Sequence, residues 1–179
     1  MRSATLRRAV ARAVGFSVTA GFKGYTRPNR GKANHMTAAI RVEARHDLTP
    51  AEIDMVEDRL YEHNSAAVGQ HGGKGLGFVI RDGSDKLIGV AAGYTWAGVS
   101  ELKQMWVDKA HRGRGYAKAL LSAFVDEARK RGVRRIWVAS YDFQAPTMYE
   151  KAGFERITEF EGWPEGHINV ILCKRFDAK

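Results

Sequence analysis

The stretch His111-Arg112-Gly113-Arg114-Gly115-Tyr116-Ala117 joins an apolar run that ends at Val107 to a strongly amphipathic segment. Glycine lets the backbone adopt positive φ and approach a ligand closely. The start of a helix adds unpaired N–H groups, the positive end of the helix dipole and, with neighbouring N–H groups, an anion-binding nest. With the charge of its two arginines, the stretch predicts a site for a pyrophosphate-bearing cofactor. The alternative interpretation is a tight connection shaped by the two glycines.

The residues that follow predict a helix from about Gly115 to Arg131. Gly132 comes after Lys130-Arg131, a typical C-terminal signal because glycine ends helices and cations favour the last turn. The run 134–141 predicts a strand, so the glycine-rich stretch lies in a strand–loop–helix–strand unit, which favours a sheet covered by helices. The helix prediction rests on apolar residues that recur at helical spacing on one face: Ala117, Leu120, Leu121, Phe124, Val125 and Ala128.

Two other phosphate-binding motifs fit the stretch less well. A Walker A loop has four residues between its first glycine and a Gly-Lys-Ser/Thr end, and the chain has no such string. The dinucleotide-binding fingerprint needs a small residue where Lys118 stands and an acidic residue at the end of the next strand, where the chain has Ser140-Tyr141.

The net charge of the chain is concentrated in its first residues. The chain has 179 residues, enough for one domain with a sizeable core, and a formal net charge of +9 from 29 basic and 20 acidic residues. Residues 1–35 hold eight of the basic residues and no acidic one, so residues 36–179 carry a net charge of only +1. The nearly neutral body argues against a nucleic-acid-binding function for it.

We therefore divide the chain into a basic leader, residues 1–35, and a domain, residues 36–179. Three interpretations of the leader stay open. The first is an upstream extension, with Met36 as the true start. The second is an organelle transit peptide, because the leader shares the acid-free and arginine-rich composition of such peptides. The third is a disordered basic arm that binds nucleic acid or membrane.

Cysteine, histidine and hydropathy patterns exclude several classes. Cys173 is the single cysteine, which rules out a disulfide framework and favours a cytoplasmic location. The six histidines show no metal-ligand spacing, so we expect no metal site. No segment reaches the ~18 apolar residues of a membrane span, so we expect no membrane partner.

The remaining elements complete a mixed α/β sheet. Thr49-Pro50-Ala51-Glu52 is a capping box that begins a helix carrying Ile53, Val56 and Leu60, and Asn64 to Gly75 predicts a mobile loop beside the site. Asp82 to Asp85 is a hairpin signal. Strands are expected at 39–45, 77–80, 87–95, 99–107, 134–141, 154–160 and 168–174, and a short helix at 145–151.

Several motifs together resemble the GNAT (Gcn5-related N-acetyltransferase) superfamily. Arg112 to Ala117 matches its Gln/Arg-x-x-Gly-x-Gly/Ala signature at all three defined positions, and Tyr149 to Phe154 resembles its Tyr-x-Lys-x-Gly-Phe block. Phe143-Gln144-Ala145-Pro146 and Pro164-Glu165-Gly166-His167 are similar to motifs of small bacterial members. The resemblance covers residues 38–176 and implies a mixed, mostly antiparallel central sheet of six to seven strands flanked by helices.

The resemblance implies an N-acetyltransferase that moves an acetyl group from acetyl-CoA directly to a primary amine of a small molecule or protein. The backbone of Met105 and Val107 would pair with the pantetheine arm like an extra strand, and the Val107 N–H would polarise the thioester carbonyl. By the same resemblance, the pyrophosphate would be held by the N–H groups of Arg112, Gly113, Arg114, Gly115, Tyr116 and Ala117.

Three residues are candidates for proton transfer. Tyr149 resembles the family's general acid. Glu101 is the first candidate for the base, because alternation is expected to place it on the same face as Lys103, Met105 and Val107. Lys103 stands where relatives have an acidic residue, which leaves the base open and is compatible with an acidic substrate. His167 is the alternative base, because its reference pKa near 6.5 suits the task. Asp142 stands where many members have an asparagine that contacts CoA.

Two rival functions stay open for the chain. One is a non-catalytic acyl-CoA-binding sensor on the same fold, and the other is a nucleic-acid-binding protein that uses the leader. A homodimer is a further hypothesis. The acceptor amine is not identified by the sequence, because acceptor sites lie in variable loops such as Asn64 to Gly75.

Overall fold

The computed structural model describes residues 40–176, so the leader and its three interpretations lie outside the described residues. Between residues 40 and 176 the structure has three helices and six strands. The helices are α2 (Pro50–Val68), α3 (Tyr116–Lys130) and α4 (Pro146–Lys151). The six strands are β1 (Lys74–Arg81), β2 (Leu87–Trp96), β3 (Val99–Val107), β4 (Arg135–Tyr141), β5 (Glu155–Glu161) and β6 (Ile168–Arg175). A short 3-10 helix, η1 (Lys109–His111), follows β3.

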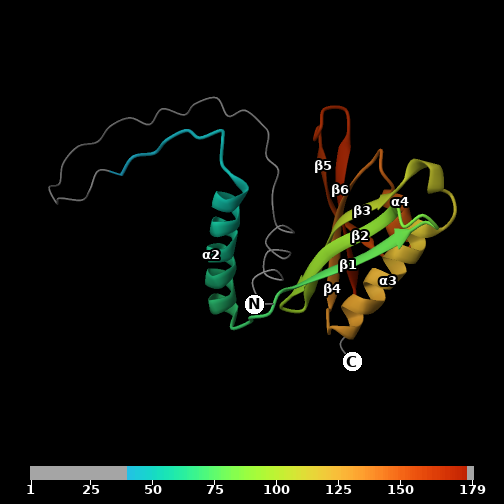
Figure 1. The fold of residues 1–179 in the computed structure, drawn as a ribbon, viewed down its shortest axis with the longest axis horizontal. Helices are drawn as coiled ribbons and strands as arrows, with labels where there is room; N and C mark the ends of the chain where they lie inside the picture. The colour runs from blue at the N-terminus through green and yellow to red at the C-terminus, as the bar shows by residue number, and fades with distance from the viewer. Residues whose placement is uncertain (1–39, 177–179) are drawn as a thin grey trace.

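The six strands form one mixed sheet in the order β1-β2-β3-β4-β6-β5. Every neighbouring pair is antiparallel except β3 and β4, which are parallel. Helices α3 and α4 lie on one side of the sheet and α2 on the other (Figure 1). The core fills the side of α3 and α4, where Phe124, Leu102, Ile136 and Leu172 are almost fully buried. The expected mixed sheet of six to seven strands is thus confirmed with six.

Helix α2 begins as the sequence predicts and ends later. The Thr49 hydroxyl accepts from the Glu52 N–H and the Glu52 carboxylate accepts from the Thr49 N–H, which completes the capping box. The helix continues to Val68 and ends at Gly69, whose φ of 64° is the left-handed conformation that glycine adopts readily. The loop predicted for 64–75 is therefore wrong at both ends, because 64–68 continue the helix and Lys74 and Gly75 begin β1.

The predicted first strand at 39–45 is also wrong over its described part. Residues 40–45 form no strand, and Ile40 and Val42 are 90% and 93% exposed. Their apolar alternation is typical of a strand, but a strand needs a neighbour for its backbone groups. Within the described chain, β1 at this edge of the sheet pairs with β2 alone.

A β-bulge at Lys103 changes which side of the sheet β3 presents. Ala92 is paired with Gln104 and Gly93 with Leu102, so Lys103 is an extra residue in β3. One extra residue moves the side chains beyond it to the opposite face. Glu101 therefore lies on the opposite face from Met105 and Val107, and the expectation that simple alternation aligns them is wrong.

We expect Gly93→Ala to destabilise the protein by about 3 kcal/mol or more, because a Cβ at Gly93 would lie 1.8 Å from the Glu101 carbonyl oxygen at the bulge. Gly77→Ala is the matched control, since its Cβ would meet only the Ala91 carbonyl oxygen at an ordinary 3.7 Å. Urea unfolding of both variants tests this. Equal midpoints would contradict the tight approach at Gly93.

Candidate active site

The loop between β3 and α3 is held by a carboxylate and ends in two left-handed glycines. Asp108 Oδ1 accepts from the Ala110 N–H at 3.0 Å and lies 3.0 Å from His111 Nδ1. The His111 contact and then the Ala110 hydrogen bond lower the pKa of Asp108. Gly113 and Gly115 have φ of 75° and 80°, the conformation for which the sequence supplies glycine.

The start of α3 carries a row of backbone donors that the rest of the described chain does not use. Gly115 caps the helix without a side-chain hydrogen bond, and the first helical bond runs from the Ala119 N–H to the Gly115 carbonyl at 3.0 Å. The N–H groups of residues 113–118 have no backbone acceptor within the described chain. A Cβ at Gly113 or Gly115 would meet nothing within 4 Å, so these two glycines border open space.

Arg112 differs from its neighbours. Its N–H donates to the Lys109 carbonyl at 3.4 Å, and its Nε donates to the Val107 carbonyl at 3.0 Å. Arg112 therefore ties the loop back to the end of β3, and the free donors begin one residue later than the sequence predicts.

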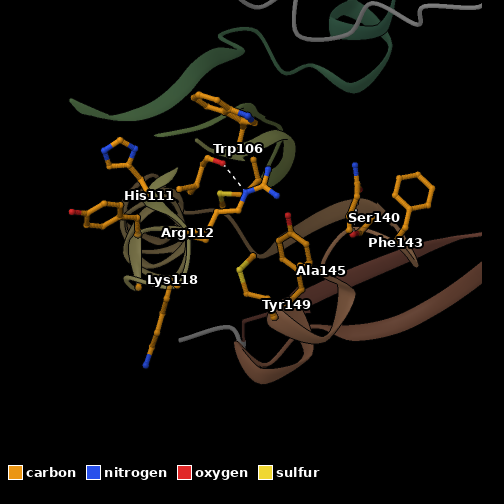
Figure 2. A pocket seen from close by; sticks show the side chains of 16 residues that line it. Trp106, His111, Arg112, Lys118, Ser140, Phe143, Ala145 and Tyr149 are labelled. Atoms are coloured by element: carbon orange, nitrogen blue, oxygen red, sulfur yellow. Dashed lines mark hydrogen bonds between the residues drawn. The ribbon is translucent and has the colours of Figure 1, made fainter. Parts of the chain in front are cut away.

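A cavity of about 580 Å³ opens in front of this loop. Its wall is formed by the end of β3, the glycine-rich loop, the start of α3, the end of β4 and α4 (Figure 2). Met105, Val107, Gly113, Gly115, Tyr116, Ala117 and Tyr149 are among the lining residues, so residues predicted separately from the sequence meet around one space.

The edge of β3 is open beside this cavity. Strands β3 and β4 pair only from Val99 with Arg135 to Glu101 with Trp137 and then separate. The Asp108 N–H donates to the Ile88 carbonyl, so Asp108 directs its backbone groups toward β2. Because this direction alternates from residue to residue in an antiparallel pair, Met105 and Val107 direct their backbone groups away from β2. These groups point to the open edge, where an extended ligand can pair like another strand.

Tyr149 reaches the cavity from α4. Its side chain is 5% exposed, and its ring packs edge-on against Phe154 at 5.7 Å between centroids. Burial raises the pKa of the hydroxyl to about 12. The hydroxyl points into the cavity, on the side of Arg112 and Ser140 (Figure 2). Tyr149 is thus a protonated donor at neutral pH.

Glu101 lies away from the cavity lining, on the face turned toward α2. Burial raises its pKa, although a hydrogen bond with the Tyr94 hydroxyl and the charge of Lys103 oppose the shift. Burial likewise lowers the pKa of Lys103, against the charges of Glu101 and Glu57. Glu101, Lys103 and Glu57 of α2 therefore form a half-buried charged group between the sheet and the helix.

His167 comes just before β6 and does not itself line the cavity. Its Nδ1 is 3.1 Å from Asp142 Oδ1, and its ring meets Phe143 edge-on at 4.9 Å between centroids. Phe143 lines the cavity and stacks on Tyr141 at 5.0 Å. The sequence did not predict the contact of His167 with Asp142, because the two residues are 25 positions apart and no local pattern joins them.

No group of three or more potential metal ligands is found among residues 40–176. In the same part of the chain, no helix has the length and apolar character needed to cross a membrane.

A row of unused backbone donors beside an open sheet edge would suit a long, phosphorylated ligand, and the comparisons with known proteins identify the class of the protein. Residues 39–154 match the Acetyltransferase (GNAT) family. An acetyltransferase of Agrobacterium fabrum is 30% identical over 131 residues, which cover 73% of this chain and 96% of the relative. The chain belongs to the GNAT family and is an acetyltransferase.

Solved structures agree with this membership. A crystal structure assigned as an acetyltransferase, from Agrobacterium tumefaciens, has a TM-score of 0.71 at 27% identity and covers 76% of this chain and all of its own. A structure from Bacillus anthracis assigned as a streptothricin acetyltransferase, with acetyl-CoA bound, has a TM-score of 0.51 at 19% identity and covers 57% of this chain and 63% of its own. The fold is therefore one that binds acetyl-CoA. The sensor and nucleic-acid functions are not favoured.

We expect Gly115→Glu to abolish acetyl-CoA binding, because a carboxylate at the start of α3 would repel a pyrophosphate and fill its space. Gly132→Glu is the matched control: Gly132 has a similar φ of 75°, also with no atom within 4 Å of a Cβ, but follows the other end of α3. Isothermal titration of both variants with acetyl-CoA tests this, and retained binding by Gly115→Glu would refute the loop assignment.

Proposed function

We propose that the chain transfers the acetyl group of acetyl-CoA directly to a primary amine, within a complex that holds both substrates. The observation that carries this proposal is the row of unused N–H donors at residues 113–118, which includes two glycines that border open space and lies next to the free edge of β3. The donors at 113–117 would hold the pyrophosphate, and the guanidinium groups of Arg112 and Arg114 would add positive charge.

The open edge of β3 suits the amide-bearing pantetheine arm. Met105 and Val107 would exchange backbone hydrogen bonds with its amides, as a strand does. The Val107 carbonyl already accepts from Arg112, so its N–H is the group left to polarise the thioester carbonyl. The bulge at Lys103 and the separation of β3 from β4 would keep this donor accessible.

Two proton transfers complete the reaction. A lysine-like amine, of pKa about 10.4, must lose a proton before it attacks, and the departing thiolate must gain one. Tyr149 would donate to the thiolate. Its raised pKa makes it a weak donor, but the same dry surroundings raise the pKa of the thiol and so favour the transfer. For the base, Glu101 and His167 are both candidates.

The acceptor class remains to be found by experiment. One relative is named for the alanine of a ribosomal protein and another for blasticidin-S, and the chain spans about half the length of each. A screen must therefore include peptide N-termini as well as small amines, both cationic and acidic. The single, unpaired Cys173 supports a cytoplasmic location, because a reducing compartment keeps thiols free.

Acetyl-CoA is expected to stabilise the protein and to be consumed only with an amine. At a concentration of about 100 times Kd, binding to the folded state adds ~2.7 kcal/mol, which a thermal melt detects. A thiol-release assay over the amine panel then measures turnover. Stabilisation without turnover would favour the sensor function. Salt-sensitive binding of nucleic acid that disappears on deletion of residues 1–35 would favour the nucleic-acid function.

Tyr149→Phe is expected to lower kcat about 100-fold, in line with the loss of a general acid, while the Kd for acetyl-CoA changes less than about twofold. The phenylalanine keeps the ring that packs on Phe154 and removes only the hydroxyl. Steady-state kinetics and a melting curve test the two parts. An unchanged kcat would remove the acid role from Tyr149.

A further inference from the structure

We propose that Asp142 is a positioning residue that holds His167 as the base for the attacking amine. The proposal rests on the acetyl transfer proposed above and adds a residue to its machinery. It is carried by the geometry of the pair and by its place next to the wall that also carries Tyr149.

The pair fixes which nitrogen of His167 is free. Nδ1 lies 3.1 Å and 3.4 Å from the two carboxylate oxygens of Asp142. A carboxylate at Nδ1 favours the tautomer with a proton there, which leaves the lone pair on Nε2. Asp142 is the only charged side chain within ion-pair distance of His167 in residues 40–176. Nε2 is therefore a positioned proton acceptor.

Both residues are held by the backbone around them. The Asp142 N–H donates to the Ile168 carbonyl at 2.9 Å, and Asp142 Oδ1 accepts from the Phe143 N–H at 2.8 Å. The His167 N–H donates to the Pro164 carbonyl at 3.0 Å, and the His167 carbonyl accepts from the Gly162 N–H at 3.0 Å. These hydrogen bonds hold Asp142 and His167 in place. Because an exposed ion pair adds little stability, we attribute to the pair a role in the reaction.

The pair and Tyr149 are placed by one connection. Asp142 ends β4 and Tyr149 lies in α4, and the segment between them includes Phe143 and Gln144, which line the cavity. His167 packs its ring edge against Phe143. Tyr149 thus lines the cavity directly, and His167 contacts its wall through Phe143, next to the space where an amine and a thiolate would exchange protons.

Glu101 is less suited to the same task. It lies on the face turned to α2, and its carboxylate is engaged by the Tyr94 hydroxyl. The side chain of His167 is 44% exposed, so Nε2 is open to an amine that arrives from solvent.

The step balances without another reactant. The ammonium form of the amine first releases one proton to water. As the neutral nitrogen forms its bond to the carbonyl carbon, Nε2 of His167 takes one N–H proton. The C–S bond breaks with its electron pair on sulfur, and the Tyr149 hydroxyl gives that sulfur a proton. The imidazolium then loses its proton to water, and the phenolate regains one.

The experiment compares His167→Ala, Asp142→Asn and the double variant with an amine found in the screen. Loss of a general base lowers kcat about 100-fold, so we expect that loss for His167→Ala and about 10-fold for Asp142→Asn, each with KM for acetyl-CoA within about twofold of wild type. The double variant is expected to match His167→Ala, because Asp142 acts only through the imidazole.

Chemical rescue separates positioning from structure. Free imidazole is expected to restore His167→Ala and the double variant to the same extent, because a diffusible base does not need Asp142. Glu165→Gln, which removes a carboxylate from the same turn, is the control and should keep the wild-type kcat. His167→Gln replaces His167→Ala if the smaller side chain prevents folding.

Three outcomes would overturn the proposal. A raised KM for acetyl-CoA with unchanged kcat in Asp142→Asn makes Asp142 a cofactor contact. Losses that multiply in the double variant make the two residues independent. A near-normal His167→Ala beside an inactive Glu101→Gln makes Glu101 the base. In each case wild-type turnover still supports the proposed function, whereas turnover of no amine by the wild type would overturn that function itself.

Discussion

The incomplete pairing of strand β3 with β4 is the constraint on which the rest of the site depends. Strand β3 pairs with β2 along nearly its whole length but with β4 over only three residue pairs. The bulge at Lys103 lies just beyond the last of these pairs and requires the missing side chain of Gly93. If β3 and β4 paired to their ends, the backbone groups of Met105 and Val107 would be consumed within the sheet. The open edge, the cavity beside it and the access of Tyr149 all depend on this local failure of pairing.

Local chemistry explains what the sequence predicted correctly. The glycine-rich loop, the amphipathic α3 and the capping box of α2 each depend on residues close in the chain, and all three are present in the structure. Features that depend on distant neighbours were missed. The bulge at Lys103 needs Gly93 of another strand, and the contact of Asp142 with His167 joins the ends of β4 and β6. The strand expected near residue 40 had the right alternation, but pairing partners decide whether such a run becomes a strand.

The two sides of the sheet differ in charge as well as in packing. Three cationic residues, Arg112, Arg114 and Lys118, lie around the start of α3, which suits a polyanionic ligand. On the other side, α2 holds five acidic residues and one basic residue, and Glu57 and Glu101 lie near Lys103. The two sides of the sheet therefore differ in charge, and an anionic donor would be attracted to the side of α3.

The pyrophosphate site proposed at the start of α3 would rely mainly on main-chain N–H groups, with glycine needed at only two of its positions. Main-chain donors are the same whatever side chains the neighbouring residues carry. Side chains that select the acceptor would have no such protection. Gene duplication and mutation would therefore change the acceptor while the site for the acetyl donor is kept. One backbone site would then serve many enzymes that differ in their acceptor.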